Sequence, residues 1–121
     1  MATVSVNRSA PLDVEIRART LAVFSYVAQR RVPGGDYVDF ATGKDSDQVS
    51  ESVYRLRVDA PIAAFTDLRI YFLVSAKPDR PYDVRVQLSQ GGGPVGDPLH
   101  CSGTVGADGK MVFDSVEATF P

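Results

Sequence analysis

Alternation of apolar and polar residues is the strongest pattern in this chain, and it is most regular over residues 82–89. The apolar set there is Tyr82, Val84, Val86 and Leu88. A period of two sends successive side chains to opposite faces of a β-strand, so one face of this strand is expected to be buried. Residues 12–18 alternate in the same way and carry charged residues on the other face, which predicts a second half-buried strand.

Less regular alternation extends this interpretation to most of the chain, with further strands predicted at residues 2–7, 37–40, 53–59, 67–76, 99–105 and 111–120. Turn-forming residues separate the predicted strands. Two prolines within residues 77–81 predict that the flanking strands are antiparallel partners, and two glycines within residues 106–110 predict a final hairpin. A further hairpin is expected around Pro33. Residues 41–52 lack periodicity, so they are expected to form an exposed loop.

Residues 20–31 admit two interpretations, because neither face of this segment is polar. As a helix, it would have Thr20 as its N-cap and two arginines near the negative end of the helix dipole. As a strand, its β-branched and aromatic residues would suit a pleat that is buried on both sides. The neighbouring segments are all predicted strands, so we favour the strand.

Short strands joined by Gly- and Pro-containing turns predict one all-β domain over residues 1–121. We expect a single antiparallel β-sandwich, Ig-like or jelly-roll-like, of about seven to nine strands. A short helix in residues 20–31 or 60–66 is the alternative for those two segments. No repeat or linker divides the chain, and its length suits one core.

Composition and charge argue against several functional classes. An apolar fraction of 44% and a charged fraction of 23% are ordinary for a globular domain. The formal net charge of −2 provides no global field that would favour nucleic acid. The longest mostly apolar stretch, residues 21–28, is far shorter than the roughly 20 residues that span a bilayer, so no membrane insertion is expected.

Cysteine usage and the first residues predict a cytoplasmic location. Cys101 is the only cysteine, and the opening residues alternate like a strand instead of forming the apolar core of a signal peptide. Export by a leaderless route, or removal of a leader, is the alternative.

The chain offers few groups for catalysis. His100 is the only histidine and stands beside Cys101. Adjacent residues in a strand point to opposite faces, which works against the hydrogen bond that a Cys-His nucleophile needs. Asp13 and Glu15 share a strand face, but arginines on that face are expected to keep both ionised, which argues against a general acid. We therefore predict no catalytic residue.

No cofactor is predicted, and calcium is the alternative. One histidine and one cysteine are too few for a typical zinc site. Asp45 and Asp47 lie in the expected loop at residues 41–52 and are a weak calcium candidate, because calcium takes oxygen ligands. The spacing of a complete calcium-binding loop is missing, and acidic residues are common in turns, so a solvated acidic loop is favoured.

Arginines fall at outward positions of several predicted strands. They are Arg17, Arg19, Arg55, Arg57, Arg69 and Arg85. If these strands are neighbours, the guanidinium groups line up and can bind carboxylates, phosphates or a partner subunit through bidentate hydrogen bonds. The ligand-binding candidates are Arg55, Arg57, Arg85, Arg17 and Arg19. The favoured alternative is a salt-bridged surface that includes Asp13, Glu15 and Asp83.

The predicted strands carry more apolar residues than one core face accounts for. Residues 67–76 have an outer set with Tyr71 and Leu73, and residues 21–28 are apolar on both sides. Contiguous exposed apolar area marks contact surfaces, where Tyr and Arg are enriched. The interface candidates are Tyr71, Leu73, Arg69, Phe24 and Tyr26. The alternative is that the crossover at residues 61–66 covers this face.

These observations favour a non-catalytic binding or assembly protein that self-associates and presents loops to a partner. The loops are expected at residues 34–35, 44–50 and 90–97. The partners are a second copy of the chain and, beyond it, another protein or a glycan; no nucleic acid is expected. A lectin-like carbohydrate-binding or calcium-dependent module is the first alternative, and a small hydrolase is the second.

Overall fold

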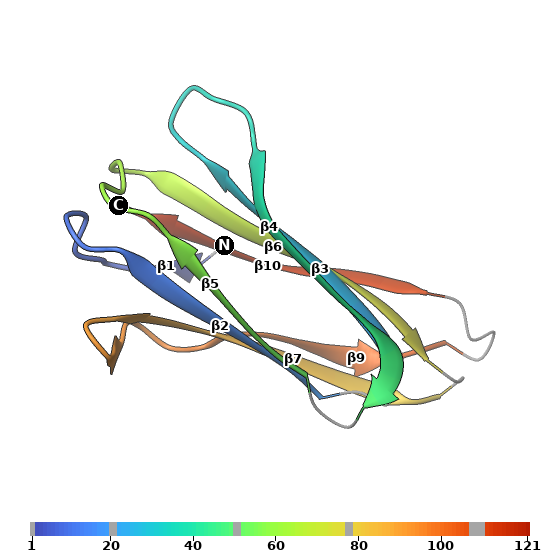
Figure 1. Cartoon of the computed structure of the whole chain (residues 1–121). Coiled ribbons are helices and arrows are strands. Elements are labelled where there is room, and N and C mark those ends of the chain that lie inside the picture. The colour runs from blue at the N-terminus through green and yellow to red at the C-terminus, as the bar shows by residue number, and fades with distance from the viewer. Residues whose placement is uncertain (1, 20–21, 50–51, 77–78, 107–110) are drawn as a thin grey trace.

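Two five-stranded sheets lie face to face in the computed structural model, which describes residues 2–19, 22–49, 52–76, 79–106 and 111–121 (Figure 1). Sheet I has the order β1-β10-β6-β3-β4, with the respective bounds Ala2–Thr3, Val112–Phe120, Thr66–Ala76, Ala22–Arg31 and Val38–Val49. Sheet II has the order β5-β2-β7, and both β8 and β9 pair with β7. The respective bounds are Ser52–Val58, Leu12–Arg19, Pro81–Gln90, Gly93–Pro94 and Leu99–Thr104. The predicted all-β sandwich is confirmed.

The core lies between the sheets and is built from the inward set of each strand. Its largest fully buried side chains include Phe24, Phe72, Phe120, Leu12, Ile16, Leu68, Ile70 and Leu88. The rings of Phe24 and Phe72 stack with 5.5 Å between centroids, and Tyr26 meets the Tyr54 ring edge-on at 4.9 Å. Aromatic rings thus contribute much of the apolar area that the two sheets bury against each other.

Two of the predicted interface residues, Phe24 and Tyr26, belong to this core. They are 0% and 6% exposed, because the alternation of β3 puts them on its inner face. Ser25 and Val27 lie on the outer face and are partly exposed. The strand prediction for residues 20–31 is confirmed over the described part, and the described ranges contain no helix there or in residues 60–66.

The range 41–52, expected as a loop, is largely strand. β4 pairs with β3 and has a register irregularity beside Ala28. Its own residues have low strand propensity, but pairing with β3 overrides that preference. Gly43 is required where β4 passes over the aromatic core, because a Cβ at this position would overlap Cε1 of the Tyr26 ring.

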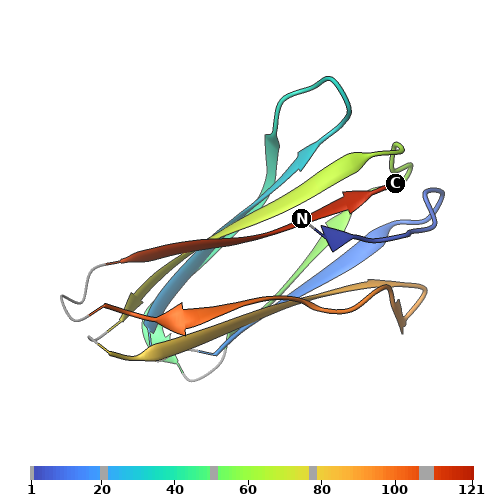
Figure 2. The ribbon, with the colours of Figure 1, turned by 180° about the vertical axis from the view of Figure 1, so that it is seen from behind.

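The chain crosses between the sheets more often than its turn residues predict. β6 lies in sheet I and the next strand, β7, lies in sheet II. The chain crosses back later, because β9 lies in sheet II and β10 lies in sheet I, as Figure 2 shows from behind. The hairpins predicted at residues 77–81 and 106–110 are therefore wrong, whereas the hairpin of β3 and β4 is confirmed. A short turn-rich connection can join two strands of one sheet or two strands of opposite sheets. The alternation of apolar and polar residues is the same in both cases, so it does not distinguish them.

The predicted strand at residues 2–7 is paired only at its start. β1 runs parallel to β10, and the amide of Val4 donates to the carbonyl of Thr119 at 2.9 Å. The chain must then cross to sheet II to enter β2, which ends the pairing. Val4 is 6% exposed, so this crossing adds to the core.

Replacing Gly43 with alanine tests the close approach of β4 to the core. G43A should lower the free energy of unfolding by about 1–3 kcal/mol, because the Tyr26 ring must move to admit the methyl group. Urea denaturation measures this change. G93A is a suitable control, since a Cβ there meets only the carbonyl oxygen of Gln90, at 3.8 Å. Equal stability of G43A and the wild type would contradict the packing described here.

Candidate functional site

An exposed apolar patch lies on the outer face of sheet I, on the side away from sheet II. On β6, Leu73 lies across from Phe113 of β10, and Tyr71 lies across from Val27 of β3. Tyr71 is 41% exposed and Phe113 is 77% exposed, whereas Val27 and Leu73 are half-buried. We call these four residues the outer patch. Three adjacent strands thus present apolar side chains to solvent side by side.

Arg69 lies beside the outer patch and is held in place by its neighbours. Its guanidinium carbon is 3.5 Å from the centroid of the Tyr37 ring and 4.5 Å from that of Tyr71. Its Nε and Nη2 donate to Oε1 of Gln29 at 3.0 and 2.8 Å, and Gln29 donates to Asp39 at 2.6 Å. These cation-π contacts and hydrogen bonds order the side chain before a partner binds, which reduces the entropy lost on binding.

Charges of both signs surround the outer patch in equal number. The described charged side chains of this face are Arg31, Lys44, Arg69, Asp39, Asp67 and Glu117. The hydroxyl of Thr119 donates to Asp67 at 2.6 Å, and Arg31 contacts the same carboxylate at 2.7 Å. Both contacts lower the pKa of Asp67, with that of Thr119 the larger cause. The charges of the described side chains on this face therefore sum to zero at pH 7.

The crossover at residues 60–66 leaves the outer patch uncovered. The amide of Ile62 donates to the carbonyl of Arg8 at 2.9 Å, and Ile62 is 3% exposed. The amide of Phe65 donates to the carbonyl of Phe120, the last residue of β10. This segment closes one end of the sandwich, so the alternative in which it seals the outer face is wrong.

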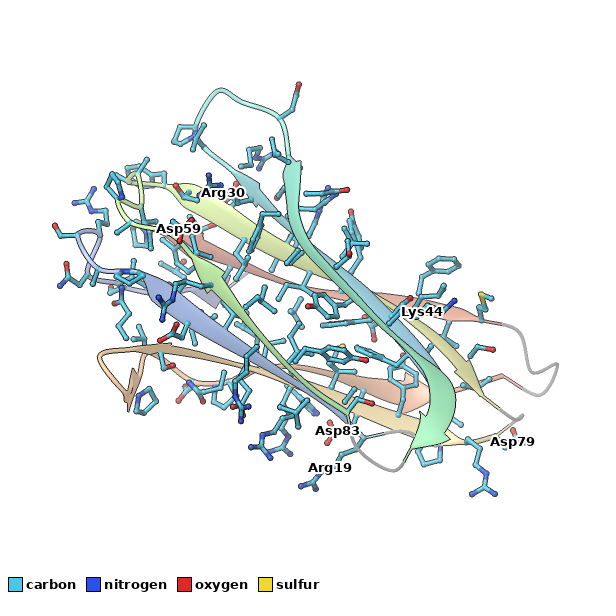
Figure 3. The ribbon with its side chains drawn as sticks, in the orientation of Figure 1. Arg19, Arg30, Lys44, Asp59, Asp79 and Asp83 are labelled. Carbon is cyan, nitrogen blue, oxygen red and sulfur yellow. The ribbon has the colours of Figure 1, made fainter. Side chains whose placement is uncertain are left out.

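The outer face of sheet II gathers five of the six predicted arginines, while Arg69 lies on sheet I. Neighbouring strands bring together Arg17, Arg19, Arg55, Arg57 and Arg85. Three carboxylates lie among them: Asp13, Glu15 and Asp83. Figure 3 shows Arg19 and Asp83 on this side of the sandwich. Among the described side chains of this face, five arginines against three carboxylates leave an excess of two positive charges, on a chain whose net charge is −2.

The ion pairs on this face are exposed. Nε of Arg57 lies 3.0 Å from Asp13, and Nε of Arg55 lies 3.3 Å from Glu15. Exposed pairs of this kind contribute little to stability, because water screens them. A hydrogen bond from Arg17 at 2.7 Å is the main cause that lowers the pKa of Glu15, so this carboxylate is ionised, as expected.

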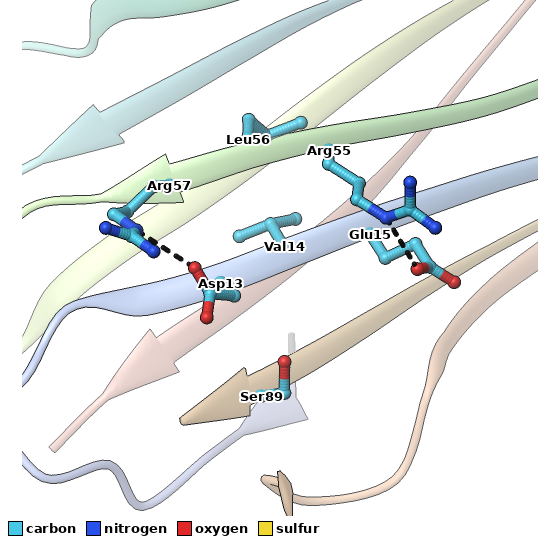
Figure 4. Close-up of a pocket in the computed structure, with 7 residues that line it drawn as sticks. All are labelled: Asp13, Val14, Glu15, Arg55, Leu56, Arg57 and Ser89. Carbon is cyan, nitrogen blue, oxygen red and sulfur yellow. Dashed lines mark hydrogen bonds and ion pairs between the residues drawn. The ribbon is translucent and has the colours of Figure 1, made fainter. Parts of the chain in front are cut away.

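An open hollow of about 520 Å³ lies over β5 and β2 on the same face (Figure 4). It is lined by Asp13, Val14, Glu15, Arg55, Leu56, Arg57 and Ser89. The charged side chains stand on this outer face, whereas Val14 and Leu56 belong to the inward set of their strands and pack in or against the core.

His100 and Cys101 point to opposite sides of β9, as predicted. Nε2 of His100 contacts Asp83 on the outer face, whereas Cys101 packs against the core near Asp114. Burial, with Asp114 as a further cause, raises the pKa of the Cys101 thiol to about 12. A thiol with this pKa is protonated at neutral pH and is a poor nucleophile.

The two calcium candidates, Asp45 and Asp47, lie in β4 and not in the expected loop. Their side chains are outside the described residues. In the part of the chain that the structure describes, no group of three or more His, Cys, Asp and Glu side chains is arranged to hold a metal ion.

No protein-family model, curated protein or solved structure matches this chain. Over the described ranges, no helix has the length and apolar character needed to cross a membrane. Function is therefore inferred from the two outer faces alone.

Two residues of the sheet I surface, Phe113 and Tyr37, are missed by the sequence interpretation. In β10, Phe113 falls in phase with the polar residues Ser115, Glu117 and Thr119. A large aromatic residue in the polar set of a strand is a usable signal of a contact surface. Tyr37 precedes β4 and contacts two arginines, Arg31 at 4.4 Å and Arg69 at 3.5 Å. It lies in the connection between β3 and β4, where no alternation of apolar and polar residues identifies it.

The raised pKa of Cys101 predicts a slow reaction with thiol reagents. At pH 8 the folded protein should react with iodoacetamide about 100-fold or more slowly than the urea-unfolded chain, whose thiol pKa is about 8.5. Quenched-flow labelling followed by mass spectrometry measures both rates. Similar rates in the folded and unfolded states would show that the thiol is neither buried nor held protonated.

Proposed function

We propose that this protein is a non-catalytic assembly module that binds a second copy of itself through the outer face of sheet I. The observation that carries the proposal is the outer patch, in which Phe113 is 77% exposed and Tyr71 is 41% exposed on adjacent strands. Water solvates such contiguous apolar area poorly, so covering it releases free energy. In a two-fold arrangement each copy contributes the same patch, so each residue buried in one copy has an equivalent residue buried in the other.

Charge favours a second copy over a strongly charged partner at this face. The side chains that the structure describes on this face include three positive and three negative charges, so these charges give no net repulsion between two copies. Lys44 on β4 and Glu117 on β10 lie on opposite sides of β3 and β6, so a two-fold related copy can offer an unlike charge at each rim. The outer face of sheet II, with its positive excess, opposes stacking on itself.

The tyrosines and Arg69 suit the centre of such an interface. Tyr and Arg are enriched in interface cores, and Arg69 is already stacked against Tyr37 and Tyr71. The loop at residues 34–35 and the connection over residues 90–97, which includes the short strand β8, lie outside the outer patch and remain available to a further partner. Residues 44–49, expected to be a third such loop, belong to β4.

A charged substitution within the outer patch tests this proposal. F113D should weaken self-association by about tenfold or more, because a carboxylate would be buried against apolar side chains of the partner. Sedimentation velocity over a wide range of protein concentrations measures the dissociation constant. The wild type should form one defined oligomer.

F65D is the matched control for this experiment. Phe65 is 64% exposed and also aromatic, but it lies in the crossover at the end of the sandwich. F65D should associate like the wild type. A wild type that remains monomeric at high concentration, or equal weakening in both variants, would refute self-association through the outer patch.

A further inference from the structure

β5 is the terminal strand of sheet II and pairs with no further strand among the described residues. Alternate residues of such a strand direct their N–H and C=O groups away from the sheet, so the edge can accept another strand. Figure 1 shows β5 diverging from β4 toward the end of β5, and β4 does not pair with this edge. We call residues 55–58 the β5 edge.

The two arginines of this edge use only part of their hydrogen-bond donors. Arg55 and Arg57 reach Glu15 and Asp13 only through Nε. Their side chains are 76% and 60% exposed, and their Nη groups have no partner in the described part of the chain. Figure 4 shows these two Nε contacts as dashed lines. Each guanidinium therefore retains terminal N–H donors for another carboxylate.

Strand geometry matches these donors to an extended peptide. Arg55 and Arg57 are two residues apart in one strand, which separates them by about 6.6–6.8 Å. Alternate side chains of an added strand have the same spacing. Leu56, between them, is half-buried on the inner face of β5 and packs against the core, so an apolar side chain suits the intervening position of that strand.

We propose that the β5 edge binds an extended acidic segment of another protein, which joins sheet II as an added strand. Its backbone pairs with β5, and its alternate carboxylates bind Arg55 and Arg57. Charge complementarity selects this occupant, because the face has an excess of two positive charges. A second copy of β5 at this edge would set arginine against arginine, so the edge excludes self-pairing.

The probe is a fluorescein-labelled peptide, Gly-Glu-Val-Glu-Val-Glu-Gly, with binding to the full chain followed by fluorescence anisotropy. The peptide should bind the wild type, and the double variant R55Q/R57Q should bind it about tenfold or more weakly. Methylation of alternate peptide amides should weaken binding without changing peptide charge, because it removes main-chain hydrogen bonds. Circular dichroism verifies that each variant is folded.

R30Q/R80Q is the matched control, since it removes the same charge elsewhere. Arg30 lies in β3 of sheet I (Figure 3), and Arg80 is exposed ahead of β7. This control should bind the peptide like the wild type, and so should F113D, because the outer patch lies on the other sheet.

Four outcomes would overturn the proposal: no binding by the wild type, equal affinity of R55Q/R57Q, equal loss in R30Q/R80Q, or no effect of amide methylation. Dextran sulfate is the further probe, because it carries charge without peptide amides. Dextran sulfate and the unlabelled peptide are compared as competitors at equal concentrations of negative charge. Equal competition by the two would show that the face binds polyanions in general, and it would overturn strand addition.

Discussion

Packing of the two inner sheet faces against each other is the interaction on which this structure depends. Phe24, Phe72 and Phe120 are each 1% exposed or less and lie between the sheets. Because side chains alternate along a strand, each residue that points into this core forces its neighbours outward. The outer faces are thus a geometric consequence of the core, and their chemistry is free to serve function.

The two outer faces have different chemistry. That of sheet I is neutral and carries an exposed apolar cluster, with Arg69 ordered between two tyrosines. That of sheet II has an excess of arginines among its described side chains, and it ends at β5, which pairs with no further strand in the described part of the chain. A neutral apolar face tolerates its own copy, whereas a basic edge repels it and attracts an acidic segment. This difference is the basis of the two proposals, self-assembly through the outer face of sheet I and binding of an acidic segment at the edge of sheet II.

Alternation was sufficient to predict the fold class, most strands and the outward arginines. It was insufficient where tertiary contacts decide the outcome. β4 contains Gly43 and other weak strand formers, and it is a strand because β3 pairs with it. Phe24 and Tyr26 lie in a segment that is apolar on both sides, so the sequence left open which set faces the core. The sequence also did not show which sheet each strand joins, because the same kind of short turn connects strands within a sheet and strands of opposite sheets.

Residue-level protection measures most directly whether the outer face of sheet I is covered by a second copy. Hydroxyl-radical footprinting at increasing protein concentration should show falling oxidation of Tyr71 and Phe113, while oxidation of Phe65 stays constant. Constant oxidation of Tyr71 and Phe113, across concentrations at which the protein associates, would contradict this account.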